Sequence, residues 1–185
     1  MWGGSRVADP PGTSIARIVR AMSRPPRIAG FDYLGPHQYF VTFCTRARSE
    51  TFSDPAIASL VLMHFRRTAR HAAFAILAYC LMPDHVHMLV EGKTATADFR
   101  RFIKRLKQAS AQAYSHRTGH RLWQEGYYDR VLRPGDDAQA VARYIVGNPV
   151  RAGLAASPLE YPHVGSDVWT LEDLIDSVSV SESDA

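Results

Sequence analysis

The chain has 185 residues, 46% of them hydrophobic and 22% charged, a composition typical of one globular domain with a substantial core. No apolar run approaches the roughly 18 residues of a membrane span, and the N-terminal region lacks the apolar stretch of a secretory signal, so we expect a cytoplasmic protein with no membrane partner. Residues 1–154 carry 22 basic against 11 acidic side chains, a net charge of +11 that favours an anionic partner, nucleic acid first, or reflects solvated surface charge.

In chain order, short β-branched or aromatic runs alternate with longer segments that have apolar residues at helical spacing. Residues 1–30 show no period, and we expect them to be flexible whether translation starts at Met1 or Met22. The patterns then predict strand, helix, strand, strand, helix, strand and helix at residues 39–45, 53–72, 74–82, 85–92, 96–119, 127–134 and 136–150. The acidic tail over 155–185 adds a weaker helix at 171–178.

This order of elements predicts an α+β fold for residues 31–154. The first six elements match the ferredoxin-like split βαβ arrangement, in which an antiparallel sheet carries two helices on one face. The helix over 136–150 then follows the last core strand. The other face of the sheet is expected to be open.

The helix predicted over 96–119 has a charged face of one sign. Five basic side chains crowd the surface beside its apolar positions: Arg100, Arg101, Lys104, Arg105 and Lys107. We regard them as candidate contacts to a nucleic-acid backbone, which would strengthen binding without reading sequence and would make it sensitive to salt. A solvated helix face is the alternative.

The strand predicted over 85–92 carries two histidines in an otherwise apolar run, His85 and His87. Residues i and i+2 of a strand point to the same face, so the two imidazoles project together while Val86 and Met88 turn away. Such a pair either ligates one divalent cation with a third group from elsewhere, or decorates an exposed sheet face. A metal beside a basic surface suggests phosphate chemistry.

The last predicted helix offers a nucleophile and a further ligand. Tyr144 and Asn148 are four residues apart, which places them on one helical face. A tyrosine hydroxyl can form covalent intermediates, and a carboxamide oxygen can ligate a hard cation. The alternative for Tyr144 is a ring that packs under the sheet.

The other aromatic, histidine and cysteine residues have structural interpretations. Trp123, Tyr127 and Tyr128 are interpreted as core residues or as stacking platforms for unpaired bases, and Tyr114 as packing. Four histidines without a partner at ligand spacing are interpreted as surface residues: His37, His71, His116 and His120. Both cysteines lie in apolar segments and are expected to be buried free thiols: Cys44 and Cys80.

Four blocks of the sequence resemble one known family. "LMPDHVHMLV" resembles the HUH motif (His, hydrophobic, His) of single-tyrosine transposases. "LWQEGYYDRVLR" and "ARYIVGNPVRAGL" resemble the blocks that follow it in the REP-associated tyrosine transposases, and "MSRPPRIAGFDYLGPHQYFVTFCT" resembles the opening of that branch. The resemblance spans about Met22 to Leu154, and the ordered set of blocks is specific although H-x-H alone is not.

The resemblance implies an enzyme that cleaves and joins single-stranded DNA beside a short imperfect hairpin. In the family two histidines hold Mg²⁺ or Mn²⁺ at the scissile phosphate, here His85 and His87. The nucleophile lies on the helix after the last core strand, here Tyr144, and its attack implies a 5′-phosphotyrosine link and a free 3′-OH. In relatives a dimer can combine one chain's tyrosine with the other chain's histidines, and both a homodimer and a monomer stay open here.

Two positions depart from the family pattern. Asp84 stands where many relatives have Asn, and it either touches the metal site or only shapes the turn. Asn148 stands where the transposon enzymes often have Gln, and its shorter side chain weakens the case for it as the third ligand. The alternative functions are a non-catalytic protein that binds hairpin or single-stranded DNA, and a metal hydrolase that uses a bound water. The acidic tail matches nothing in the family and either competes with DNA or is inert.

Overall fold

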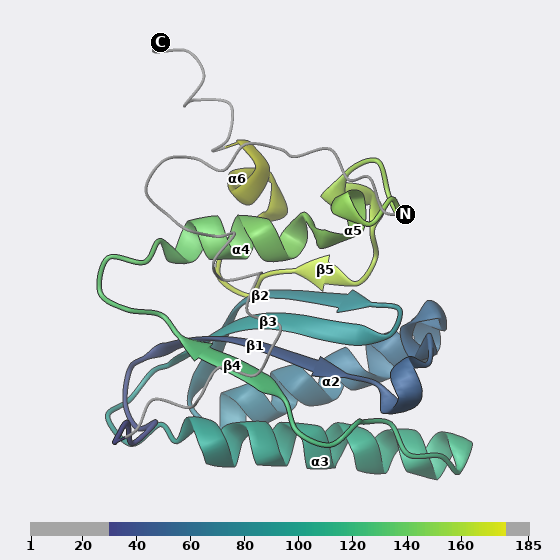
Figure 1. The fold of residues 1–185 in the computed structure, drawn as a ribbon, viewed down its shortest axis with the longest axis horizontal. Helices are drawn as coiled ribbons and strands as arrows, with labels where there is room; N and C mark the ends of the chain where they lie inside the picture. The colour runs from purple at the N-terminus through teal and green to yellow at the C-terminus, as the bar shows by residue number, and fades with distance from the viewer. Residues whose placement is uncertain (1–29, 177–185) are drawn as a thin grey trace.

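An antiparallel sheet has a layer of helices on each face, as the computed structural model shows for residues 30–176 (Figure 1). The flexible segment predicted over 1–30 lies outside the described residues, apart from Gly30. The strands lie in the order β4-β1-β3-β2-β5: β1 Gln38–Cys44, β2 Phe74–Met82, β3 His85–Gly92, β4 Tyr128–Val131 and β5 Val164–Gly165. The first four have the order of the ferredoxin-like split βαβ arrangement, so the predicted fold class is confirmed.

The helices differ in length, and local capping residues mark the ends of the two longest. They are α2 Pro55–His71, α3 Phe99–Thr118, α4 Ala138–Val146, α5 Asn148–Arg151 and α6 Leu171–Asp176, with short 3-10 turns η1 Arg46–Arg48, η2 Thr51–Ser53 and η3 Pro158–Glu160. Asp54 accepts from two main-chain N–H groups in the first turn of α2, and Asp98 accepts from Arg101 at the start of α3. Gly119 follows α3 in the left-handed conformation, with φ 75°.

Side-chain alternation along the strands divides the core in two. Tyr39, Val41 and Phe43 of β1 belong to the first core, which contains the apolar faces of α2 and α3. Phe40 belongs to the second core, which contains the apolar faces of α4 and α6. Every residue of β2 is buried. Because β2 and β3 lie between two helical layers, a polar side chain on either strand needs a partner or a cavity.

Three features differ from the sequence-based expectation. The sheet has a fifth strand, β5, whose two residues pair with Tyr79 and Cys80. The face expected to be open is covered over much of its area by α4 and α6, because their apolar residues complete the second core. The helix predicted over 136–150 is interrupted at Gly147 and becomes α4 and α5.

These differences have local physical causes. A strand of two residues is too short to show a period in sequence. Pro149 lacks the N–H group that would continue the hydrogen-bond ladder of α4. The helix predicted over 171–178 begins at Leu171, as α6, and residues 177–178 lie outside the described range. Within residues 30–176, no helix is long and apolar enough to cross a membrane.

Substitution of Gly92 tests how closely the end of β3 packs against the chain at Gly35. A Cβ at this position would lie 2.3 Å from the carbonyl oxygen of Gly35, and backbone cannot move aside as a flexible side chain can. We expect Gly92→Ala to lower the free energy of unfolding by about 1–3 kcal/mol, as overpacking does, with urea unfolding as the measurement. Gly119→Ala is the control, because its Cβ would have no atom within 4 Å and only the backbone strain remains. Equal losses in the two variants would contradict the close approach.

Candidate active site

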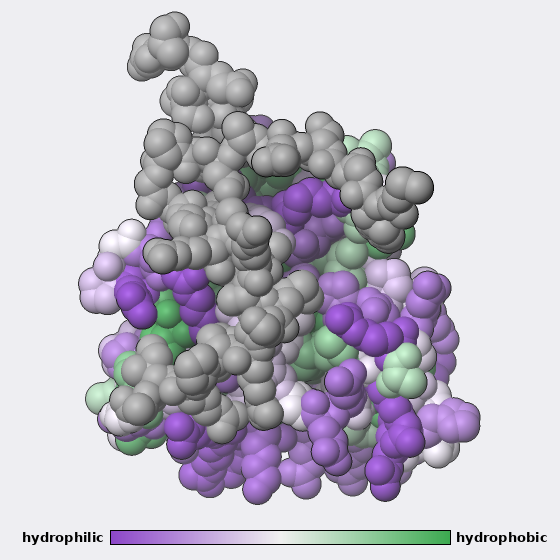
Figure 2. All heavy atoms as spheres, viewed as in Figure 1, coloured by the Kyte–Doolittle hydropathy of each residue, from purple (hydrophilic) through white to green (hydrophobic). Residues whose placement is uncertain are grey.

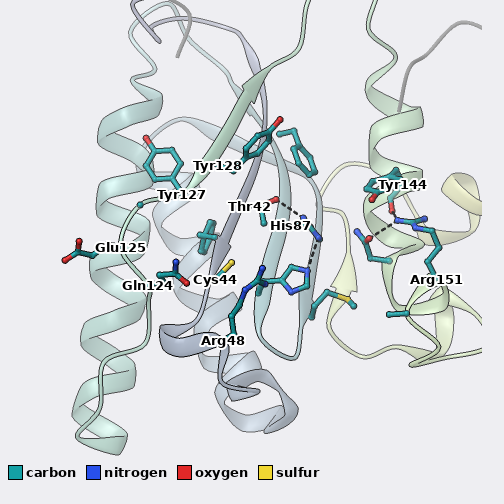
Figure 3. Close-up of a pocket in the computed structure, with 17 residues that line it drawn as sticks. Thr42, Cys44, Arg48, His87, Gln124, Glu125, Tyr127, Tyr128, Tyr144 and Arg151 are labelled. Atoms are coloured by element: carbon teal, nitrogen blue, oxygen red, sulfur yellow. Dashed lines mark hydrogen bonds between the residues drawn. The ribbon is translucent and has the colours of Figure 1, made fainter. Parts of the chain in front are cut away.

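The predicted metal and nucleophile candidates line one cavity. Its volume is about 790 Å³, and it lies between the β1–β3 part of the sheet and the α4–α5 segment (Figure 3). His85 and His87 come from β3, whereas Tyr144 and Asn148 come from α4 and α5. The fold therefore brings these four residues to one cavity within a single chain.

The two imidazoles converge through their Nε2 atoms, which lie 3.0 Å apart. Both rings project from the same face of β3, as the i, i+2 spacing predicts. His87 is 8% exposed, and Phe40 of the adjacent strand stacks beside it with ring centroids 5.7 Å apart. The pair therefore presents two nitrogen atoms to one point at the edge of an apolar wall.

The opposite ring nitrogens are held by neighbouring side chains. Asp84 Oδ1 lies 2.5 Å from His85 Nδ1, and Thr42 Oγ1 lies 2.8 Å from His87 Nδ1. Thr42 is the direct partner of His87 in the β1–β3 register, which places its hydroxyl beside the ring. Arg48 Nη1 donates to Asp84 Oδ2 at 3.2 Å and fixes the carboxylate in turn. Asp84 thus contacts the histidine pair as well as forming the turn before β3.

Burial keeps His87 neutral. The pKa of His87 is lowered to about 3, chiefly by desolvation, with smaller contributions from His85, Arg151 and Arg48 in that order. A metal ligand has to be the neutral imidazole, which is the form that burial favours here.

The histidine pair fits a divalent cation. Two imidazole nitrogens bound at about 2.1 Å and roughly at right angles are about 3 Å apart, which is the spacing found here. Nδ1 hydrogen bonds to a carboxylate or hydroxyl are the usual way in which proteins orient metal-binding histidines. Among residues 30–176, no group of three or more His, Cys, Asp and Glu side chains is placed to hold a metal, so a further ligand has to be of another kind.

Tyr144 and Asn148 are held by one side chain that the sequence analysis did not single out. The Arg151 guanidinium lies over the Tyr144 ring, with Cζ 3.9 Å from the ring centroid, and donates to the Tyr144 carbonyl oxygen. It also donates to Asn148 Oδ1 at 2.8 Å. A carboxamide oxygen has two lone pairs, so Asn148 can accept this bond and still ligate a cation. Its role as third ligand stays a prediction.

The remaining cavity wall is aromatic and polar. Tyr128 packs edge-on against Phe40, and Cys44 lines the cavity as a half-exposed free thiol, unlike the fully buried Cys80. Trp123 packs in the first core and donates from Nε1 to Ser110 Oγ at 3.0 Å. Trp123 is thus a core residue, whereas Tyr128 is placed where an unpaired base could stack.

The predicted DNA-binding residues lie on the opposite side of the sheet from most of this cavity. Four of the five side chains on α3 are exposed: Arg100, Arg101, Lys104 and Arg105. Lys107 instead donates to the carbonyl oxygens of Gln124 and Gly126, and burial lowers its pKa. Because Gln124 and Gly126 line the cavity, Lys107 connects α3 to the cavity wall.

The whole α2–α3 layer lacks carboxylates. The two helices carry nine Lys and Arg side chains and three His side chains, with no Asp or Glu. Figure 2 shows hydrophilic residues along the lower edge of the molecule, where α3 lies. A groove of about 580 Å³ between these helices brings His64, His71 and His116 together with Arg67 and Arg105. Spacing along the chain could not reveal this grouping, because the residues come from two helices.

Comparisons of sequence and of structure both identify similar proteins of one kind. Residues 35–148 match the family described as "Transposase IS200 like". A Haemophilus influenzae protein named as a REP-associated tyrosine transposase is 23% identical over 143 residues, which cover 71% of this chain and 81% of that protein. A solved structure of a REP-associated tyrosine transposase bound to a REP hairpin has a TM-score of 0.60 at 22% identity, over 71% of this chain and 78% of that one. At this identity the structural similarity shows the fold.

The contacts to Nδ1 predict how metal affinity depends on Asp84. We expect Asp84→Ala to weaken Mn²⁺ binding roughly tenfold to a hundredfold, since His85 loses the partner that orients its ring. Asp84→Asn keeps an acceptor oxygen and should lose less. Titration calorimetry with Mn²⁺ measures both, and Asp173→Ala, an exposed acidic residue on α6, controls for net charge. Unchanged affinity in Asp84→Ala would show that the carboxylate only shapes the turn.

Proposed function

The chain belongs to the IS200-like transposase family, and on this premise we propose that it is a metal-dependent endonuclease and strand transferase. Its substrate in this proposal is single-stranded DNA that contains a hairpin, and its intermediate is a covalent 5′-phosphotyrosine. The observation that carries the proposal is the cavity that His85, His87 and Tyr144 line together. The hairpin is carried over from a structural neighbour that is bound to a REP hairpin.

In the proposed reaction Tyr144 is the nucleophile. Its hydroxyl oxygen forms a bond to the phosphorus of one phosphodiester, and the bond from phosphorus to the 3′-oxygen breaks. The phenolic proton is lost to solvent, and the departing 3′-oxygen takes up a proton to become a 3′-OH. The phosphotyrosine keeps the energy of the broken bond, so a 3′-OH can reverse the step without ATP.

His85 and His87 would hold the divalent metal, Mg²⁺ or Mn²⁺, with Asn148 as a further ligand. When bound, the metal polarises a phosphoryl oxygen and stabilises the charge that builds up in the transition state. Asp84 and Thr42 orient the two rings through Nδ1. The tyrosine and both histidines of one chain line one cavity, which supports a site formed in cis and a protein that works as a monomer.

The α2–α3 layer is the proposed DNA-binding surface. Two neighbouring helices without a carboxylate repel each other's charges, and an anionic partner relieves that repulsion. The exposed side chains Arg101 and Lys104 are suited to phosphate contacts along a hairpin stem. The single-stranded flank would then pass the β4 edge, beside the loop that Lys107 holds, to reach the cavity.

Tyr144→Phe tests the nucleophile. We expect the variant to lose the covalent protein–DNA adduct completely while binding the same DNA, because only the hydroxyl is removed and the ring still packs under Arg151. A hairpin oligonucleotide incubated with Mn²⁺ and run on a denaturing gel measures the adduct as a slowed, protease-sensitive band. Cleavage that survives in Tyr144→Phe but is lost in His85→Ala would favour a bound water as the nucleophile. A wild-type protein that binds the hairpin without any adduct would favour the non-catalytic alternative.

Salt dependence tests the DNA-binding surface. Each phosphate contact contributes about 0.9 to the slope of log binding constant against log salt, so Arg101→Gln and Lys104→Gln should each lower its magnitude by about one. Fluorescence anisotropy with a labelled hairpin at several salt concentrations gives the slope. Arg143→Gln is the matched control, because Arg143 lies on α4 and is already paired with Asp137. If both variants have the same slope as Arg143→Gln, α3 does not contact the DNA phosphates.

A further inference from the structure

Arg151 contrasts with several arginines that surround the sheet. Four of them pair with a carboxylate: Arg48 with Asp84, Arg66 with Asp167, Arg130 with Asp136 and Arg143 with Asp137. In the part of the chain that the structure describes, Arg151 has no carboxylate partner. Among residues 30–176, its polar and ring contacts are to neutral groups of Tyr144 and Asn148, and it lines the same cavity as the histidine pair.

The position of the guanidinium is built into the chain. Arg151 turns back along the end of α4, and its Nη1 passes so close to Gly147 that a Cβ there would lie 2.8 Å away. Nη2 donates to the Tyr144 carbonyl and to Asn148 Oδ1. The side chain as a whole is exposed, but its charged end lies over the Tyr144 ring and against Asn148 at the cavity wall. An anion bound in the cavity would stabilise the positive charge of this guanidinium.

We propose that Arg151 is a further catalytic residue, which binds the scissile phosphodiester beside the Tyr144 hydroxyl. The inference rests on the proposed function above. A guanidinium is the side chain best suited to phosphate oxygens, because its planar fork of donors can bind two of them at once. Of its donors, Nη2 is used by two protein acceptors, the Tyr144 carbonyl oxygen and Asn148 Oδ1.

In the reaction, Arg151 stabilises charge on the non-bridging oxygens while bonding at phosphorus changes. The Tyr144 oxygen–phosphorus bond forms, the bond to the 3′-oxygen breaks, and Arg151 itself gains and loses no proton. Its stack on the Tyr144 ring also holds the nucleophile in one orientation. The competing structural role is that of a helix cap, since arginines often bond the last carbonyl groups of a helix.

Direct observation of the guanidinium separates these roles. In the Tyr144→Phe protein without metal, where no cleavage interferes, the ¹⁵N resonance of Arg151 Nε–H is assigned by comparison with Arg151→Gln and followed during titration with inorganic phosphate. The proposal expects a saturable shift of this resonance and no matching shift of Arg143. A Tyr144→Phe protein in which Arg151 does not respond, or responds only as Arg143 does, overturns it.

Kinetics then test the catalytic part. Arg151→Gln should slow adduct formation about a hundredfold to a thousandfold, as loss of one charge-stabilising donor does, with little change in hairpin affinity. Arg151→Lys should be intermediate, because it keeps the charge and loses the fork. Arg143→Gln, which removes the same charge from the neighbouring helix, should change the rate little. A mere helix cap would instead lower the melting temperature of Arg151→Gln and leave its adduct rate close to that of Arg143→Gln.

Gly147→Ala is a second variant that keeps the arginine. Its Cβ would displace the end of a flexible side chain, and its 3.2 Å approach to the Arg143 carbonyl oxygen asks for a shift of a few tenths of an ångström only. The protein should therefore fold, and the adduct rate should fall in the same direction as in Arg151→Gln. An unchanged rate in both variants overturns the proposal. If the wild-type protein forms no adduct at all, the proposed function fails, and the phosphate titration still decides whether Arg151 binds the anion.

Discussion

The site depends on the alternation of side chains along β3. Because β3 lies between β1 and β2 in the sheet, its residues point by turns into the two cores, and His85 and His87 share the face of the second core. A polar pair on such a strand is tolerated only where it has partners, and Thr42 and Asp84 supply them. The same bonds leave both Nε2 atoms directed at one point. The hydrogen bonds that make the histidine pair acceptable on a buried strand thus also fix the geometry of the pair.

The sheet also separates two kinds of chemistry. On one side, α2 and α3 bury apolar stripes and expose a surface to which the two helices themselves contribute basic side chains and no carboxylate, which suits a polyanion. On the other side, α4 covers the sheet only in part and leaves a cavity beside the histidine pair. Lys107 links the two, since it belongs to α3 and holds the main chain of the cavity loop. Lys107 was predicted to contact DNA because of its charge, but in the structure its ammonium group donates hydrogen bonds to main-chain carbonyl oxygens.

The break between α4 and α5 shapes the other half of the cavity. Pro149 cannot continue the helix, and Gly147 has no side chain to block the path of Arg151. The guanidinium consequently returns over the Tyr144 ring and reaches Asn148. In an uninterrupted helix, Arg151 would lie nearly two turns beyond Tyr144. The stack on the Tyr144 ring therefore depends on the Arg151 side chain pointing back along α4.

Local patterns in the sequence determined the element types, the ferredoxin-like order and the shared face of His85 and His87, because strand and helix periods depend only on nearby residues. The resemblance of four sequence blocks to one family singled out Tyr144 as the candidate nucleophile. Only the tertiary structure decided that α4 covers much of the face expected to be open, that Asp84 and Thr42 contact the histidines, and that Arg151 lies on the Tyr144 ring. These are contacts between residues far apart in the chain, or between a side chain and a turn whose shape depends on packing, and no period in the sequence encodes them.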